Sequence, residues 1–563
     1  MRKSLPLTGI AVLSAALVGW GPPPDARVAA PDPPVADAAM RDDAGAVRAL
    51  LEEGADVNAA QADGMTALHW AAENGDADLA ATLVHAGAYL EATTRIGDYT
   101  PLHLAARAGS EATVEALLDA GSDLAPITSA SGATPLHFAA QSGSARTVSA
   151  LVRAGAEVDI RAAYRGQTPL MWAAAENRAE ASSVLLGAGA DPDLHTEVVD
   201  IARREKEDEL AEDGGRGYGP SEESEEENER PRPLSYAELV GSHGGLTALL
   251  HAAREGNVEA VLTLLDGGAD IDRGSAGDGT SPLLIATING HFDLARLLLE
   301  RGADPTLASE AGATPLFAAL NLQWAPESEY PQPQAHKQQR TTYLELMRAL
   351  LEAGADPNAR LTKHLWYLSY NRDYLSVNLT GATPFWRAAY ATDVEAMKLL
   401  MEYGADPSIP TKRVPERRYR RGGGGEGADP SGLPPVPIGG PAVHPIHAAS
   451  GVGYGQGYAS NAHRHVPGGW LPAVRYLVEE IGADVNARDH NGYNAIHHAA
   501  ARGDDELIRY LVEQGGDVTA VSRRGQTTAD MANGPVQRLE PFPETVALLE
   551  SLGSENNHNC VSC

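Results

Sequence analysis

The sequence predicts an all-α solenoid, a stack of helix-turn-helix units, and three observations support this fold class. The chain has 563 residues, which is too long for one ordinary core, so several domains or one elongated array is expected. It holds 58 Gly but only 5 Phe, a composition that suits small-residue helix packing better than an aromatic-rich β fold. A short apolar pattern also recurs along most of the chain at a nearly constant period, as it does in stacked repeats.

The first 33 residues have the order of an export signal followed by a spacer. Arg2 and Lys3 precede an uncharged, mostly apolar run from Leu5 to Trp20, and a Pro-rich stretch comes next. The apolar run is marginal for a membrane span, which needs about 20 residues. We therefore expect residues 1–33 to be a cleaved signal peptide and spacer, and the protein to be exported, either periplasmic or extracellular. An uncleaved N-terminal anchor is the alternative.

Four closely similar motifs define a first block at residues 34–193. Their central leucines are 34 residues apart and are Leu68, Leu102, Leu136 and Leu170. A threonine begins each motif and can cap a helix, and the proline that usually follows fits the first helical turn. A second apolar helix follows in each unit, and a glycine ends it. No unit has enough apolar surface to fold alone, so stacking must supply the core.

The same pattern resumes after an interruption and defines a second block at residues 245–553. Leu249 and Leu283 are again 34 residues apart, and further copies include "ATPLFAALN", "ATPFWRAAY", "VHPIHAASG" and "YNAIHHAAARGD". The first unit of the chain, with Val35 in the leucine position, and the last unit, "QTTADMAN", are degenerate. Atypical terminal units are expected because one face of an end repeat meets water.

These units resemble the ankyrin-repeat family, whose pattern is a T-P-L-H-x-A-A helix, a turn, a longer helix with paired leucines, and then G-A-D. One such motif would be weak evidence, but about a dozen copies at a near-constant period are strong evidence. The resemblance covers about Val35 to Gly553 apart from insertions, and the N-terminus fits an exported, bacterial-type member. It implies an ankyrin solenoid of about twelve units with long finger-loop insertions.

Two adjacent histidines, His497 and His498, raise the question of a metal or catalytic pair. His497 occupies a slot that other units also fill with histidine, at His69, His103, His137 and His447. In the family that the chain resembles, this histidine bonds locally and braces neighbouring turns. His498 occupies a variable position, held elsewhere by Trp70, Leu104 and Phe138. We expect structural roles for both, with a metal or catalytic pair as the alternative.

Motifs of enzyme chemistry are absent from the sequence. The stretch "RGGGGEG" lacks the Lys-Ser/Thr of a phosphate-binding loop, and neither H-E-x-x-H nor G-x-S-x-G occurs. Four histidines fall between residues 444 and 465, but one is the repeat histidine, and no carboxylate or cysteine spacing supports a metal site. We therefore expect no enzyme, no cofactor and no bound metal.

An acidic insertion separates the two blocks. Leu170 and Leu249 are 79 residues apart, so about 45 residues are added to the period, and they include the run "SEESEEENERPRP" at Ser221–Pro233. Such runs are normally solvated, so we expect residues 194–244 to be disordered and the two blocks to share little interface. An acidic surface for a basic partner or divalent cations is the alternative.

Four more insertions interrupt the second block. Those at residues 322–341 and 452–470 fall between the two helices of a unit, whereas those at residues 361–380 and 411–440 follow a Gly-Ala-Asp phrase. In the family that the chain resembles, finger loops project from this second position. The long insertions should therefore emerge along one edge of the solenoid.

The two inserted fingers differ in chemistry, and we expect them to form a partner-binding site. The first is rich in aromatic residues and the second in arginines, so an aromatic anchor would lie beside a cationic rim. The alternative is that both loops fold back and cover the solenoid. The expected binding residues are Trp366, Tyr367, Tyr370, Tyr374, Arg417, Arg418 and Arg420.

The C-terminal tail at residues 554–563 ends in a C-x-x-C pair. Cys560 and Cys563 are the only cysteines in the chain. In an oxidising compartment we expect them to form a disulfide with each other. A link to another thiol, a bound metal or an attached haem are the alternatives.

The sequence favours a binding role. The formal net charge of -32 disfavours nucleic acid as a partner. We expect a monomeric protein-binding scaffold or adaptor that holds a protein partner on its concave face and finger loops, with no membrane span beyond the N-terminal signal. The alternative is a redox or metal/haem-carrying accessory protein that acts through the C-terminal C-x-x-C.

Overall fold

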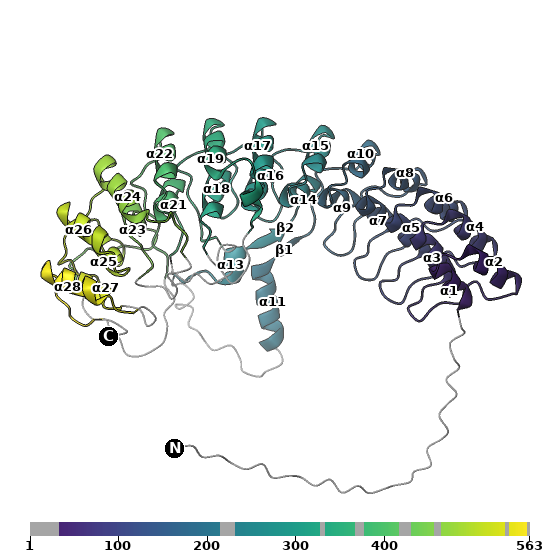
Figure 1. The fold of residues 1–563 in the computed structure, drawn as a ribbon, viewed down its shortest axis with the longest axis horizontal. Helices are drawn as coiled ribbons and strands as arrows, with labels where there is room; N and C mark the ends of the chain where they lie inside the picture. The colour runs from purple at the N-terminus through teal and green to yellow at the C-terminus, as the bar shows by residue number, and fades with distance from the viewer. Residues whose placement is uncertain are drawn as a thin grey trace, which may run out of the picture.

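The protein is an arch of stacked helix pairs, as the sequence predicts (Figure 1). In this computed structural model, the first helix of each pair lies on the inner side of the arch and the second on the outer side. Loops project from the inner side. The residues that the structure describes are 33–213, 231–326, 333–365, 377–415, 429–454, 463–534 and 540–559.

The first block is regular, and each pair consists of a short inner helix and an outer helix. Its pairs are α1 (Pro34–Met40) with α2 (Ala44–Glu52), α3 (Ala67–Asn74) with α4 (Ala77–His85), α5 (Pro101–Ala108) with α6 (Glu111–Asp119), α7 (Pro135–Ser142) with α8 (Ala145–Arg153), and α9 (Pro169–Ala175) with α10 (Ala179–Gly187).

The second block repeats this plan with longer connections. Its pairs are α14 (Ala248–Glu255) with α15 (Val258–Asp266), α16 (Pro282–Ile288) with α17 (Phe292–Glu300), α18 (Pro315–Gln323) with α19 (Tyr343–Glu352), α21 (Pro384–Tyr390) with α22 (Val394–Glu402), α23 (Pro445–Ala449) with α24 (Trp470–Arg475) and the π-helical η3 (Tyr476–Glu480), α25 (Ala495–Ala500) with α26 (Asp505–Glu513), and α27 (Thr528–Ala532) with α28 (Pro543–Ser551).

Local chemistry explains where each inner helix begins and ends, and α5 is representative. The Thr100 side chain accepts a hydrogen bond from the backbone of His103, and Pro101 occupies the first turn. The helix ends at Gly109, whose φ of 70° is a left-handed conformation that glycine adopts without strain. Ala105 and Ala106 are fully buried, which allows neighbouring inner helices to pack closely.

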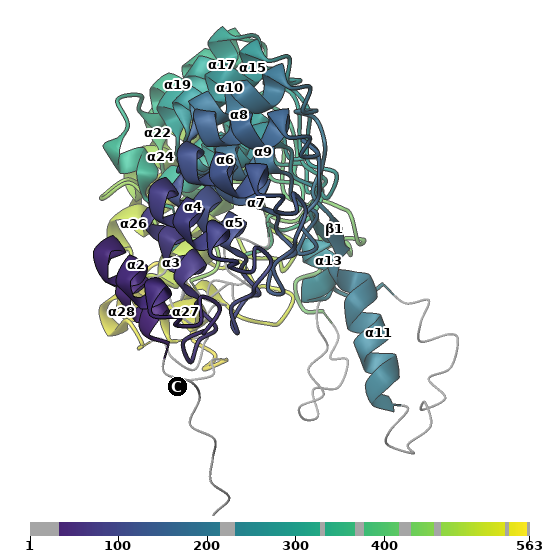
Figure 2. The same ribbon diagram turned by 90° about the vertical axis from the view of Figure 1, so that its right-hand side faces the viewer.

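The insertion between the blocks is ordered at both of its ends, so the expectation of a disordered segment over residues 194–244 is wrong there. β1 (Val198–Asp200) pairs antiparallel with β2 (Ser242–Gly244). α11 (Ile201–Asp213) and α13 (Tyr236–Val240) flank the two strands, and Figure 2 shows α11 leaning away from the stack. Strand pairing extends a finger and supplies backbone hydrogen bonds that the acidic composition does not suggest. Residues 214–230 lie outside the described residues.

Successive fingers are joined by a ladder of backbone hydrogen bonds that continues through this insertion. The Glu197 amide donates to the Arg165 carbonyl at 2.9 Å, on the side of the first block. The Gly245 amide donates to the Glu197 carbonyl at 3.0 Å, and the Ala276 amide donates to the Gly245 carbonyl at 2.8 Å. The inserted residues therefore leave the finger and return to it without breaking the ladder.

The helices at the junction also pack directly. α9 of the first block contacts α14 of the second, as α10 contacts α15. The Asn257 side-chain amide donates to the carbonyls of Ala174 at 2.9 Å and Ala175 at 2.8 Å. The two blocks thus form one continuous stack, which corrects the expectation that they share little interface.

The remaining insertions have partly defined structures. Within residues 322–341, α18 continues to Gln323, and the 3₁₀ helix η1 (Ala335–Gln338) precedes α19. Residues 463–469 lead directly into α24. Over the described part of the chain, no helix combines the length and the hydropathy needed to cross a membrane.

Candidate binding groove on the concave face

Aromatic side chains line the inner helices of the first block. They come from the variable position after the repeat-histidine slot, at Trp70, Phe138 and Trp172, and from Tyr99 in the second finger; in the unit of Trp172 this slot holds Met171. The Phe138 and Trp172 rings lie 5.5 Å apart, and the Tyr99 and Phe138 rings lie 5.6 Å apart, centroid to centroid. Trp70, Tyr99 and Trp172 remain half-buried, so part of each side chain is exposed to solvent. Below, "aromatic floor" denotes these four residues.

The finger tips beside the aromatic floor expose large apolar side chains. Ile96 is 82% exposed and Tyr164 is 58% exposed, and they occupy equivalent positions two units apart. Exposed apolar side chains near a partly open aromatic surface are typical of binding surfaces. The floor and these two tips together give the first block a partly apolar surface on its inner side that can take an apolar partner surface. Below, "first-block groove" denotes this surface.

The repeat histidines hold this groove together, as expected. In α5 the Thr100 amide donates to Nδ1 of His103 at 3.1 Å, and His103 Nε2 lies 3.2 Å from the Ala133 carbonyl of the next finger. His137 makes the same link to the Gln167 carbonyl at 3.0 Å. A neutral imidazole fits both contacts, because Nδ1 accepts while Nε2–H donates. Burial lowers the pKa of His103 and of His137 to about 4, which keeps both rings neutral near pH 7.

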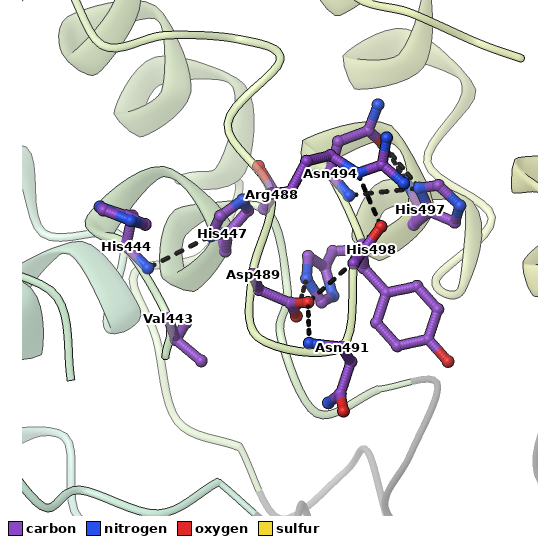
Figure 3. Close-up of polar contacts among 12 residues, drawn as sticks. Val443, His444, His447, Arg488, Asp489, Asn491, Asn494, His497 and His498 are labelled. Carbon is purple, nitrogen blue, oxygen red and sulfur yellow. Dashed lines mark hydrogen bonds and ion pairs between the residues drawn. The ribbon is translucent and has the colours of Figure 1, made fainter. Parts of the chain in front are cut away.

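His497 plays the same bracing role in the second block, which confirms the structural interpretation (Figure 3). The Asn494 amide donates to its Nδ1 at 3.2 Å, and its Nε2 lies 3.4 Å from the Gln526 carbonyl of the next finger. Burial lowers the pKa of His497 to about 3. In the preceding unit, Nε2 of His447 lies 2.9 Å from the Ala487 carbonyl oxygen.

His498 has a different environment, which the sequence alone did not indicate. Its Nε2 lies 3.3 Å from Oδ2 of Asp489, and both side chains are about 1% exposed (Figure 3). Oδ1 of Asp489 accepts from the amides of Asn491 at 2.8 Å and Tyr493 at 2.9 Å. Burial raises the pKa of Asp489, but the hydrogen bond and charge of His498 outweigh it and hold that pKa below its usual range. The finger that carries Asp489 is thus tied to α25 by a buried ion pair.

The four histidines between residues 444 and 465 do not meet in one place. His444 lies beside the repeat histidine His447. His463 and His465 lie in the insertion before α24, packed around Trp470 at 5.5 Å and 4.5 Å between ring centroids. Among the described residues, no group of three or more His, Cys, Asp or Glu is arranged to hold a metal ion.

The predicted partner site and disulfide cannot be placed, because all of their residues lie outside the described ranges. They therefore stay predictions. The residues concerned are Trp366, Tyr367, Tyr370, Tyr374, Arg417, Arg418, Arg420, Cys560 and Cys563.

Family models and one solved structure were found to be similar to this chain. Models of ankyrin repeats match residues 35–127, 102–196 and 235–309 in a three-copy form, 462–512 in a many-copy form, and 380–412 as a single repeat. The crystal structure of the human ASB11 ankyrin repeat domain is 24% identical, with a TM-score of 0.35, and covers 48% of this chain and 99% of that chain.

Curated relatives are similar over the repeats and come from eukaryotes. Ankyrin repeat and SAM domain-containing protein 6 of Danio rerio is 33% identical over 170 residues, 28% of this chain and 21% of that protein. The B-cell lymphoma 3 protein homolog of Mus musculus is 41% identical over 80 residues, 14% of this chain and 18% of that protein. Protein phosphatase 1 regulatory subunit 12A of Mus musculus is 33% identical over 84 residues, 15% of this chain and 8% of that protein.

The chain thus matches about a fifth or less of the length of each of these relatives, and what it shares with them is the repeat. The family models cover most of the helix pairs described above. The repeated sequence pattern, the stacked helix pairs and the finger ladder agree with those matches. This chain belongs to the ankyrin-repeat family.

Proposed function

We propose that the chain is a non-enzymatic protein-binding scaffold that holds a partner protein in its concave groove. The observation that carries the proposal is the aromatic floor of the first block with the exposed tips Ile96 and Tyr164 beside it. Proteins of this family generally act in protein–protein interaction, which is consistent with the role. One relative, by its name, is a regulatory subunit of protein phosphatase 1.

The finger site at residues 361–380 and 411–440 belongs to the proposal as a second contact. So does export, which rests on the order of charge and apolar residues before Pro34. The mass of the mature protein from the native host would test export, because cleavage of the signal removes the N-terminal residues. The alternative role through Cys560 and Cys563 has no support from the relatives.

Capture of partners from the native host tests the groove. We expect Ile96→Asp combined with Tyr164→Asp to abolish retention of the partner that the unmodified chain retains, because a charge in an apolar contact must be desolvated. Both side chains are largely exposed, so the melting temperature should stay nearly unchanged.

Tyr89→Asp is the matched control. Tyr89 is 68% exposed, but it occupies the position that holds aspartate in the Gly-Ala-Asp phrases of other units. We expect this variant to retain the partner. Equal retention by all three proteins would show that the first-block groove is not the binding surface.

A further inference from the structure

Two insertions wall a pocket on the concave face of the central units. Its floor comes from the inner helices α16 and α18, through Ile285, Ile288 and Leu322. β2 contributes one wall, and Ala325 and Pro333, from the insertion after α18, contribute another. Regular units lack both walls, so this pocket is a product of the irregular segments.

The pocket has the size and surface of a small-molecule site. Its volume is about 380 Å³, within the range of about 300–1,000 Å³ that is usual for such sites. Its surface is mostly apolar, with a few polar groups. An apolar body would therefore gain by leaving water, and the polar groups decide what else the ligand must carry.

The first such group is Asn321, which lies on α18 and is only 3% exposed. Its Oδ1 accepts from Nε of Arg387 at 2.8 Å. Arg387 is itself buried and is held by the Trp324 carbonyl, to which its Nη2 donates at 2.5 Å. This contact fixes the orientation of the Asn321 amide. No described residue accepts a hydrogen bond from its Nδ2, so this donor is left for a ligand.

The second group is Asp278, which lines the pocket but has its acceptors occupied. Its carboxylate accepts from the Ser275 hydroxyl at 2.6 Å, and from the Thr280 amide at 3.1 Å and hydroxyl at 2.7 Å. With this carboxylate engaged, the Asn321 amide is an unpaired donor in the lining. The other polar side chains there include those of Ser242, His243, Asn289 and Ser309. A ligand that supplies an oxygen acceptor would satisfy the amide.

We propose that this pocket binds a small, mostly apolar molecule that carries a hydrogen-bond acceptor, such as a carbonyl, carboxylate or sulfonate oxygen. Asn321 donates to that acceptor, and Arg387 is a positioning residue that orients the amide. The site is separate from the aromatic floor, so the pocket can be filled or empty independently of partner capture in the first block.

Fluorescence titration of the full chain with 8-anilinonaphthalene-1-sulfonate, which has an apolar body and sulfonate oxygens, tests the site. We expect one saturable site in the unmodified chain. Asn321→Asp keeps Oδ1 for Arg387 but replaces the donor with a carboxylate oxygen. We expect it to weaken binding at least about tenfold while the melting temperature holds.

Two variants that fill the pocket test its location. Ile288→Trp acts from the floor, and Ala325→Trp acts from the wall, outside any helix. Each should remove the site, and Ala325→Trp decides the matter if Ile288→Trp does not fold. Gln141→Trp is the matched control, because Gln141 occupies the position of Ile288 in the first block. We expect it to bind the probe like the unmodified chain.

Other outcomes overturn the proposal in distinct ways. Absence of a saturable site, or probe binding that survives both filling variants, would show that the pocket is not a site for this chemistry. Binding that the filling variants remove but Asn321→Asp leaves unchanged would overturn the acceptor requirement. The pocket would then be an apolar anchor point, which a partner side chain could also use.

Discussion

The two blocks share one architecture but fill the same positions with different chemistry. In the first, the slot after the central leucine holds His69, His103 and His137, which link fingers, and the following position forms the aromatic floor. In the second, the slot also holds Leu250, Leu284, Phe317 and Trp386, and the following position holds residues such as Arg387 and His498, both buried.

This difference shows that the ladder of backbone hydrogen bonds between fingers does not depend on the repeat histidine. Backbone hydrogen bonds between fingers continue through units that have leucine or phenylalanine in the slot, for example from the Glu310 amide to the Asp278 carbonyl at 2.7 Å. The residue in the histidine slot can therefore vary between units. The contribution of a unit to stability then depends on how well the side chain in that slot is buried. The first block keeps a partly open aromatic surface, whereas in the second a described part of one insertion packs on an inner helix, where the His463 ring stacks on Tyr390 at 4.2 Å between centroids.

The largest effect is expected at Trp386, which fills the slot in α21. The side chain is fully buried, its Nε1 donates to the Val443 carbonyl at 2.9 Å, and its ring stacks on Tyr390 at 5.3 Å. Trp386→Ala should lower the free energy of unfolding by about 3–5 kcal/mol. His137→Ala, in the same slot of the first block, should cost about 1–3 kcal/mol, mainly for hydrogen bonds lost. Urea unfolding followed by circular dichroism would measure both losses in free energy of unfolding. Equal losses in the two variants would show that the slot contributes alike in the two blocks.

A smaller effect is expected at Asp489, which ties its finger to α25. Asp489→Ala removes the ion pair with His498 and two backbone contacts, and should cost about 2–3 kcal/mol.

Thr128→Ala is the equivalent change in a first-block finger. Thr128 accepts from the Ala133 amide at 3.2 Å and pairs with the Ser131 hydroxyl at 2.9 Å. Its loss should cost about 1 kcal/mol. Thermal unfolding would compare the two variants directly. A lower melting temperature for Thr128→Ala than for Asp489→Ala would contradict the predicted order.

The last effect concerns pH. Because burial lowers the pKa of His137 to about 4 from its ordinary value of 6.5, the unfolded chain binds the proton more readily between these values. The contribution of the neutral ring is therefore complete above about pH 6.5 and is lost as the pH falls toward 4. The variant His137→Leu copies Leu284 of the second block. We expect the difference in free energy of unfolding between this variant and the unmodified chain to be smaller at pH 5 than at pH 7. A deficit that grows on acidification would reverse the sign and contradict the prediction.

The sequence predicted the repeated parts of the fold because their signals are local. Thr100, Pro101 and Gly109 mark the limits of α5 within ten residues, and the structure confirms them. The role of His497 also followed from its place in a recurring motif. Recurrence turns weak local signals into a reliable pattern.

Features that join distant segments could not be predicted in this way. β1 is three residues long, and Val198 pairs with Gly244 across an acidic insertion whose composition favours disorder. The partner of His498 is Asp489, which reaches it only because the finger folds back onto α25. The pocket beside Asn321 needs walls from two separate insertions. The apolar residues at the aromatic floor did recur every 34 residues, at Trp70, Leu104, Phe138 and Trp172, and that period was the available signal for the groove.

The central claim is that the two blocks form one continuous solenoid, and hydrogen–deuterium exchange of the full chain tests it most directly. The decisive peptides contain the amides of Glu197, Gly245 and Ala276, which carry the ladder across the junction. We predict that these junction amides exchange as slowly as two other amides of the ladder, Ser129 in the first block and Glu310 in the second. Rapid exchange at the junction, with both blocks protected, would show two separate stacks and contradict the claim.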